Sequence, residues 1–213
     1  MPRPCVRCGG RCLAEAAKAP ARQGWRAWAA LAALLAAGSA LAWPLSSALL
    51  DWQPDRALAE PWRAFTAAFV HWSEGHLVAN LGAATLVAAY GWAAAVPRAA
   101  ALAWLLAWPL THLGLLLRPD LAHYGGLSGV LHAGVAVATL WLVVAARGSR
   151  RVVGVLMGAG LLAKILSERP WAGVLQQAEG WDIALAPIGH ATGAIAGLAC
   201  AAALLARRKN RRP

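Results

Sequence analysis

The chain has 213 residues, of which 60% are hydrophobic and only 14% are charged, and its formal net charge is +11. A soluble domain of this length rarely combines so much apolar content with so little charge, so the composition excludes an ordinary water-soluble protein. Alanine and leucine dominate runs of about 20 residues, the length of a helix that crosses a bilayer. We therefore predict an all-α polytopic membrane protein.

Six membrane-spanning helices are predicted from these runs. In chain order they cover residues 27–49, 76–96, 99–117, 127–146, 152–168 and 188–206. The connections between them are too short to fold separately, so the spans form one domain over 27–206. A basic tail precedes this domain at 1–26 and another follows it at 207–213, and we expect the first tail to be disordered.

Basic and acidic residues separate along the chain. Arginine and lysine gather in the two tails and in the connections at 97–98 and 147–151, whereas most acids lie in the connections at 50–75 and 169–187. The positive-inside rule then places both tails in the cytoplasm and the acidic connections on the outer face. We place the protein in a bacterial inner membrane, with its site open to the periplasmic face. No nucleic acid is expected as a partner, because no basic stripe is interleaved with aromatic residues.

His76 and Asn80 form the first of three polar motifs near span ends. Polar side chains are costly in a membrane and are usually kept for a function. Their spacing of four places both side chains on one face of the second span. Their donor groups could there complete an oxyanion hole for a tetrahedral intermediate. The alternative, that they bond each other or backbone groups as contacts between helices, stays open.

Ser128 lies at the start of the fourth span, in the motif Gly126-Leu127-Ser128-Gly129. Glycines before the serine allow a sharp turn and leave room for a substrate chain. A helix N-terminus also presents free N–H groups to a developing oxyanion. The serine hydroxyl is therefore our candidate nucleophile. The motif is not the GxSxG elbow of soluble hydrolases, because Val130 occupies the position of its last glycine.

His190 lies in the last span, within a Gly-His-Ala-Thr-Gly motif at 189–193. Gly193 and Gly197 continue a row of glycines at every fourth position, a spacing that lets another helix approach closely. Histidine is the usual base for a serine near neutral pH. We therefore predict that His190 removes the proton of Ser128.

The choice of acid–base partners leaves one competitor and excludes two protease classes. His132 lies four residues after Ser128 on the same helix face and is a competing base, but His190, on another helix, can face the serine across a cleft. No aspartate or glutamate lies deep in a predicted span, so a Ser128–His190 dyad is simpler than a triad, and an aspartyl protease is excluded. Without an H-E-x-x-H motif, a zinc metalloprotease lacks its ligands. We expect neither a metal nor a cofactor.

The remaining histidines and the cysteines have simpler interpretations. We expect His71 and His123 in loops, and His112 as a hydrogen-bonded packing residue. Three cysteines precede the first span: Cys5, Cys8 and Cys12. They resemble half a zinc site, but a fourth ligand and a second C-x-x-C are missing, so we favour a disordered tail without metal.

Taken in order, these motifs resemble those of rhomboid intramembrane serine proteases. The segment 60–80, with its Trp62-Arg63 pair, resembles their first external loop and second span. The Gly-Leu-Ser-Gly sequence at 126–129 matches their GxSG nucleophile motif. His190, followed by Gly193 and Gly197, matches the histidine and the glycine row of their last span. The resemblance runs from residue 60 to residue 206 with a six-helix layout.

The resemblance implies a function for each matched residue. It makes Ser128 the nucleophile and His190 the general base, and it forms the oxyanion hole from His76, Asn80 and the backbone N–H of Ser128. The supporting residues that it implies are Gly126, Gly129, His132, Trp62, Arg63, Gly193 and Gly197. Rhomboids often carry an aromatic residue, commonly tyrosine, four residues after the nucleophile. This chain has His132 there, which is expected either to stack on His190 or to compete with it.

The string Gly-Leu-Ser-Gly-Val-Leu-His at 126–132 and the short chain are most like the rhombosortase branch. Members of that branch are paired with secreted proteins that bear a C-terminal Gly-Gly sorting tail, whose hydrophobic helix is cut near the glycine pair. The implied partners are the lipid bilayer and such transmembrane substrates. Two alternatives stay open. One is a general rhomboid protease with other transmembrane substrates, and the other is a non-catalytic rhomboid-like protein that binds transmembrane helices.

Overall fold

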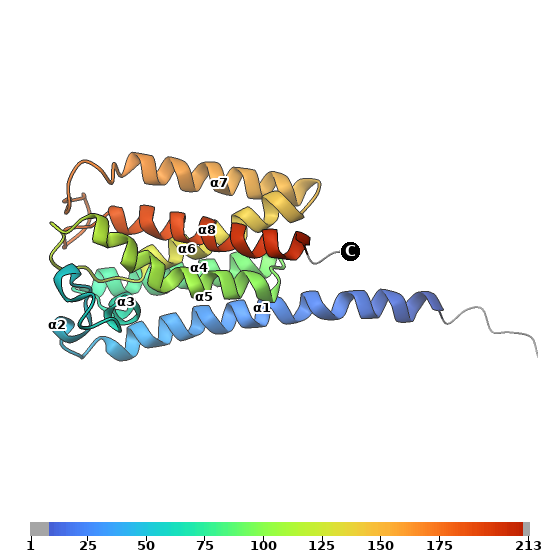
Figure 1. Cartoon of the computed structure of the whole chain (residues 1–213), viewed down its shortest axis with the longest axis horizontal. Coiled ribbons are helices and arrows are strands. Elements are labelled where there is room, and N and C mark those ends of the chain that lie inside the picture. The colour runs from blue at the N-terminus through green and yellow to red at the C-terminus, as the bar shows by residue number, and fades with distance from the viewer. Residues whose placement is uncertain (1–8, 211–213) are drawn as a thin grey trace, which may run out of the picture.

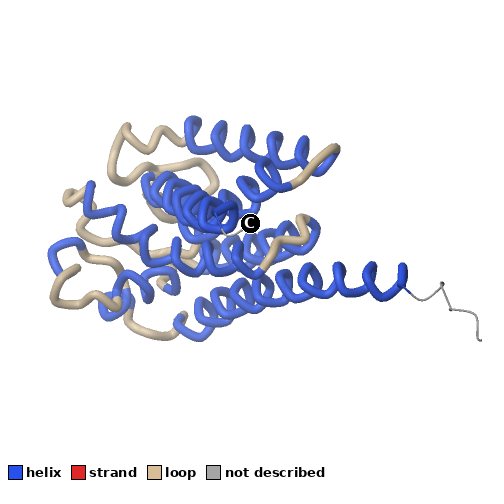
Figure 2. Tube along the Cα trace, turned by 45° about the vertical axis from the view of Figure 1, so that its right-hand side comes forward, coloured by secondary structure: helices blue, strands red, loops and turns tan. Residues whose placement is uncertain are grey.

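The computed structural model describes the backbone of residues 9–210 and the side chains from Gly24 onward, except that of Lys209. Six long helices lie side by side as a bundle (Figure 1). In chain order they are α1 (Gly9–Ala42), α4 (Glu74–Ala93), α5 (Arg98–Leu113), α6 (Ser128–Ala145), α7 (Ser149–Ser167) and α8 (Ile188–Asn210). Between residues 9 and 210 the chain forms no strand, as Figure 2 shows, so the predicted all-α class is confirmed.

Four of these helices contain a stretch that is long and apolar enough to cross a membrane. The stretches are Gly24–Ala42, Arg98–Leu117, Ser128–Ala145 and Ile188–Arg208. They belong to α1, to α5 with its 3-10 extension η3 (Gly114–Leu117), to α6 and to α8. Helices α4 and α7 occupy the positions of the second and fifth predicted spans, and their place in a membrane stays a prediction.

The first helix differs from its predicted span at both ends. α1 ends at Ala42 rather than at residue 49, because Pro44 disfavours helical backbone at the residue before it. At its other end, α1 begins at Gly9 and runs beyond the bundle (Figure 1), through most of the segment for which we predicted disorder. The many alanines of that segment favour a helix. Cys5, Cys8 and the side chain of Cys12 lie outside the described residues.

α6 is the central helix of the bundle. It packs against α4, α5, α7 and α8, and most of its side chains are buried. α8 approaches it closely, because Gly193 and Gly197 lie against the carbonyl groups of Gly129 and Ala133 and leave no room for a Cβ atom. The predicted row of glycines is thus a helix contact. It places the start of α8, with His190, beside the start of α6.

Indole rings fill the space between α1, α5 and α6. Trp28 and Trp104 are fully buried, and their ring centroids lie 4.4 Å apart. Each indole N–H donates to a backbone carbonyl, that of Trp28 to Val87 on α4 and that of Trp104 to Val130 on α6. A buried donor left without an acceptor would cost about 1–3 kcal/mol. These bonds therefore allow large aromatic rings to join α1 to the core.

Short helices cover one end of the bundle, which we call the loop end. They are α2 (Ser47–Leu50), η1 (Pro54–Arg56), α3 (Arg63–Thr66) and η2 (Ala67–Phe69). This layer pairs with the segment that leads into α6. Trp52 exchanges two backbone hydrogen bonds with Tyr124, and the N–H of Gly126 donates to the carbonyl of Ala67 at 2.9 Å. The backbone just before Ser128 is therefore fixed from both sides.

Arg63 binds the short helices of the loop end to one another. Its side chain is 3% exposed and donates to the carboxylates of Asp51 and Glu60. It also donates to the backbone carbonyls of Ala48 and Asp51. Arg63 is therefore a structural ion-pair residue of this layer, and its supporting role at the site stays a prediction. Trp62 beside it is exposed.

Candidate active site

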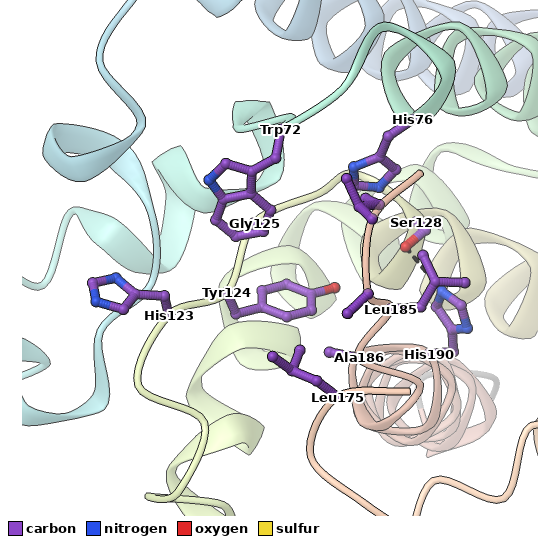
Figure 3. A pocket seen from close by; sticks show the side chains of 12 residues that line it. Trp72, His76, His123, Tyr124, Gly125, Ser128, Leu175, Leu185, Ala186 and His190 are labelled. Carbon is purple, nitrogen blue, oxygen red and sulfur yellow. Dashed lines mark hydrogen bonds between the residues drawn. The ribbon is translucent and has the colours of Figure 1, made fainter. Parts of the chain in front are cut away.

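Three long helices bring their ends together at the loop end. α6 begins at Ser128, α8 begins at Ile188 and α7 ends at Ser167. The short connection between α6 and α7 makes these two helices antiparallel, so the start of one lies near the end of the other. Figure 3 shows Ser128 and His190 pointing toward one another across this junction.

Ser128 follows a backbone turn that only glycine adopts without strain. Gly126 has φ +136°, in the region that side-chain-bearing residues rarely occupy. A Cβ atom there would also lie 2.9 Å from Cε1 of His76. Gly126 thus serves two purposes at the site: it lets the chain turn into α6, and it leaves room for an imidazole beside the serine.

His190 is hydrogen-bonded to Ser128. Its Nε2 lies 2.9 Å from the Ser128 Oγ, and its side chain is 12% exposed. The two residues come from different helices and are separated by 62 positions in the chain. If the other ring nitrogen carries the proton, Nε2 has a free lone pair and accepts from the hydroxyl. That arrangement is the one required for a base that takes the serine proton.

Glu168 supplies a partner for His190 that the sequence did not predict. Its Oε2 lies 2.7 Å from Nδ1 of His190. The sequence favoured a dyad because no acid lies deep in a predicted span, and Glu168, at the end of one, provides an acid that this prediction did not consider. Glu168 is the residue directly after α7 and the last residue of the predicted fifth span. The packing of α7 brings it to the start of α8. A sequence signal was present, because Lys164 and Glu168 are spaced as a helical ion pair, and Lys164 does bind the other carboxylate oxygen.

His132 stacks on His190 instead of binding the serine hydroxyl. The ring centroids lie 4.2 Å apart, and the planes differ by 10°. Nδ1 of His132 lies 2.7 Å from the backbone carbonyl oxygen of Ser128, one turn earlier on the same helix. Of the two expectations for this residue, stacking describes the structure.

His76 reaches the site, and Asn80 lies one helical turn away from it. Both are buried, and His76 lines the same small cavity as Ser128 and His190. The Nδ2 of Asn80 donates to the backbone carbonyl of His76 at 3.1 Å, as the alternative interpretation of this pair allowed. Nδ1 of His76 is buried without a partner among the described residues, so this ring keeps hydrogen-bonding capacity for another group.

The cavity at the site is small and has a cover. Its volume is about 30 Å³, enough for about two water molecules. Leu175 and Leu185, from the segment between α7 and α8, line it together with Trp72. A backbone bridge between Gln176 and Leu185 closes this segment on itself. The segment between α7 and α8 therefore lies beside Ser128 and narrows the space around it.

Tyr124 is a further site residue that sequence reasoning missed. Its ring lies beside Gly129 and Gly189, where a Cβ atom would meet the phenol, and its hydroxyl points toward Ser128 in Figure 3. Burial raises the pKa of Tyr124 to about 12, although hydrogen bonding with Ser128 and Gly129 opposes this shift. The phenol therefore stays neutral and keeps a proton to donate. No motif signal marked it, because an isolated tyrosine in a loop has no distinctive pattern.

His132, Glu168 and His190 place three possible metal-ligand atoms within 4.8 Å of one another. The stacked rings argue against a shared ion. The lone pair of an imidazole nitrogen lies in the plane of its ring. The two rings are stacked in nearly parallel planes, so their lone pairs do not point to a common metal position. A tetrahedral zinc site needs nitrogen ligands that converge at about 2.0–2.1 Å. This arrangement suits hydrogen bonding to His190 better than metal binding.

The other histidines lie where packing explains them. His112 is fully buried, and its Nδ1 lies 2.6 Å from the backbone carbonyl of Ala64. His123 binds Asp51 at 2.7 Å. His71 contacts His76, with ring centroids 4.8 Å apart, and burial lowers the pKa of His71. A neutral His71 adds no positive charge next to the His76 ring.

An apolar groove runs between α4 and α7, with α6 as its floor. Its volume is about 330 Å³. Its apolar lining includes Leu86, Val87, Leu131, Val135, Leu156, Met157 and Leu161. His132 and Lys164 also line it, and each of them contacts a member of the His190–Glu168 pair. The groove therefore leads from an apolar surface to the candidate site.

Comparison with known proteins adds no relative. No protein-family model matches this chain, and no curated protein matches it.

Proposed function

We propose that this protein is an intramembrane serine endopeptidase of the rhomboid type. The observation that carries the proposal is the hydrogen bond between Ser128 Oγ and His190 Nε2, at the start of two packed apolar helices. A serine and a histidine so placed are expensive to keep in a membrane unless they act together. Their surroundings, a helix N-terminus and a small cavity that His76 also lines, suit acyl transfer.

In the proposed reaction, Ser128 attacks the carbonyl carbon of the scissile peptide while its proton passes to Nε2 of His190. The oxygen of the tetrahedral intermediate accepts hydrogen bonds from the first N–H groups of α6 and from His76 and Asn80. Asn80 must turn away from the carbonyl of His76 to take part. The imidazolium then gives its Nε2 proton to the leaving amine, which leaves an acyl-serine. Water, deprotonated by the same nitrogen, releases the acid product.

The proposal includes an orientation in the membrane. In this orientation all six long helices cross a bacterial inner membrane, and the end of the bundle at which α8 ends (Figure 1) faces the cytoplasm. The basic residues at this end favour that side, whereas the acidic connections lie at the loop end. The site then opens toward the periplasm, from which the hydrolytic water comes.

The apolar groove supports a helical substrate. A transmembrane helix in contact with α4 and α7 would present its outer end to His132 and then to Ser128, without leaving an apolar environment. We propose the sorting tail of a secreted protein as the substrate, cut near its Gly-Gly pair, as in the rhombosortase branch. Glycines unwind a helix easily, so a Gly-Gly pair at the helix end gives the serine access to an extended peptide bond.

The proposal is tested by co-expression with a secreted reporter that carries a Gly-Gly, hydrophobic-helix, Arg-rich tail. We expect tail removal with the wild type, and none with Ser128→Ala or His190→Ala although both variants insert normally. Ser149→Ala, which removes an exposed serine at the far end of α7, is the matched control and should cleave at the wild-type rate.

Two outcomes would change the proposal. If the wild type leaves this reporter intact but cuts other transmembrane helices in a serine-dependent way, the protein is a general rhomboid protease and the sorting substrate is wrong. If it cuts no reporter and Ser128 does not react with an alkyl fluorophosphonate, the protease assignment is wrong.

A further inference from the structure

We propose that Glu168 is a positioning residue that converts the expected Ser128–His190 dyad into a Ser128–His190–Glu168 triad. The inference rests on the proposed serine protease function and deepens it. Two bonds to the same imidazole carry it: Nε2 lies 2.9 Å from Ser128 Oγ, and Nδ1 lies 2.7 Å from Glu168 Oε2. The acid, the base and the nucleophile are thus in line across one ring.

The carboxylate decides which ring nitrogen carries the proton. An ionised carboxylate only accepts hydrogen bonds, so Nδ1 must be the donor in the contact with Glu168. Nε2 is then the nitrogen with the lone pair, and it faces the serine. Without Glu168, the neutral ring could carry its proton on either nitrogen, and only one of the two forms can act as the base.

The same carboxylate stabilises the charge that forms during the reaction. When Nε2 takes the serine proton, the imidazolium carries a positive charge 2.7 Å from a negative oxygen. Glu168 is partly shielded from water, with its side chain 20% exposed, and this strengthens the attraction. The carboxylate takes no proton itself, as in other triads.

Lys164 fixes the second carboxylate oxygen. Its ammonium group binds Oε1 of Glu168 one turn back along α7, which leaves Oε2 for His190. The three side chains form a chain from the end of α7 to the start of α8. The lysine has a charged partner in this chain, which accounts for its position in the apolar part of α7.

A purely mechanical role for Glu168 is the alternative, because the same bond ties the end of α7 to α8. The two roles differ in what glutamine can replace. Glu168→Gln keeps the size and can still hydrogen-bond to the ring, but it has no charge and its amide N–H₂ favours the wrong tautomer. Glu168→Asp shortens the side chain but keeps the charge. Glu179→Gln, at an exposed acid of the covering segment, is the matched control.

The first experiment measures cleavage of the tailed reporter by the purified full-length variants in lipid. We expect Glu168→Gln to lower kcat on the order of 10⁴-fold with KM little changed, because triad acids act on the chemical step. Glu168→Asp should retain more activity than Glu168→Gln, and Glu179→Gln should match the wild type. Equal activity of Glu168→Gln and wild type, or a larger loss with aspartate than with glutamine, would overturn the inference.

A second readout does not require a substrate. In protein labelled with ¹⁵N-histidine, the His190 ring should carry its proton on Nδ1, and Glu168→Gln should lose that preference. The same tautomer in both proteins would refute the positioning role. If the wild type cleaves nothing and leaves the fluorophosphonate unreacted, the protease function itself fails. If it cleaves and Glu168→Gln cleaves as fast, only the triad fails.

Discussion

His132 lies flat against His190, with ring centroids 4.2 Å apart and planes within 10° of each other. The ring of His132 is itself fixed, because its Nδ1 forms a hydrogen bond with the backbone carbonyl of Ser128 on the same helix. The imidazole of His190 is therefore limited on its face by His132 and at its edge by Glu168. These two contacts restrict the orientation of the His190 ring and keep its Nε2 near the Ser128 hydroxyl.

The first prediction concerns this stacking. We expect His132→Ala to lower kcat by about 2- to 12-fold, since an aromatic pair contributes about 0.5–1.5 kcal/mol beyond its buried area. His132→Phe keeps the ring and should stay closer to the wild type. The measurement is the cleavage rate of the reporter in lipid. Complete loss of activity in both variants would mean that His132, and not His190, is the base.

The second prediction concerns Gly126, whose φ of +136° and contact with His76 both exclude a side chain. Gly126→Ala should destabilise the protein by about 1–3 kcal/mol from backbone strain. It should also lower kcat on the order of 10²-fold, because the His76 donor is displaced. Gly148→Ala, at φ +58° with open space around it, is the control. It should show the loss of stability and normal cleavage.

Equal cleavage by the two glycine variants would contradict a role for His76 in catalysis. Stability is measured by thermal unfolding in detergent, so that the effect of strain and the effect on chemistry are separated.

The third prediction concerns the contact between α6 and α8. A methyl group on Gly193 would overlap the carbonyl of Gly129, so Gly193→Ala should destabilise the bundle by about 1–3 kcal/mol. Gly160→Ala, on α7 with nothing near the new methyl group, should be neutral or stabilise the helix by about 0.5–1 kcal/mol. Thermal unfolding of both variants in detergent checks the prediction. If Gly193→Ala and Gly160→Ala melt at similar temperatures, the close contact between α6 and α8 at Gly193 does not contribute to stability.

The fourth prediction concerns alkaline pH. Burial raises the pKa of Tyr124 to about 12 from a usual value of 10.0. The folded protein therefore holds this proton more tightly than the unfolded chain does, and the stability that results is present below pH 10 and is lost as the pH rises toward 12. Tyr124→Phe should remove a pH dependence of roughly 2–3 kcal/mol over this range. Parallel curves for wild type and variant would contradict the burial of a neutral phenol.

The sequence predicted the helices well because each one carries its own signal, a long apolar run bounded by polar residues. The end of α1 was missed, since the apolar residues continue past Pro44 while the helix does not. The partnership of Ser128 with His190 followed from motifs at two helix starts. No distance was needed for this prediction. Successive helices of similar length run antiparallel, so α6 and α8, with α7 between them in the chain, begin at the same end of the bundle.

Glu168 was missed for a physical reason. It is the last residue of the predicted fifth span, where the charge separation that predicted the topology counts it among the acids of the outer face, and an acid at a span end is usually solvated. Only the packing of α7 against α6 brings it to the start of α8. Tyr124 was missed in the same way, because its place depends on the backbone pairing with Trp52 and not on its own neighbours in sequence.

One consequence of α7 concerns the timing of catalysis. α7 packs chiefly against α6, and it is both a wall of the apolar groove and the carrier of Glu168. A helix that widens the groove by pushing α7 outward would pull the carboxylate away from His190. The base would then be weak while the substrate enters and strong again once α7 has returned. Under the proposed function, a guest helix too bulky to allow that return would occupy the groove without being cut, and so act as an inhibitor.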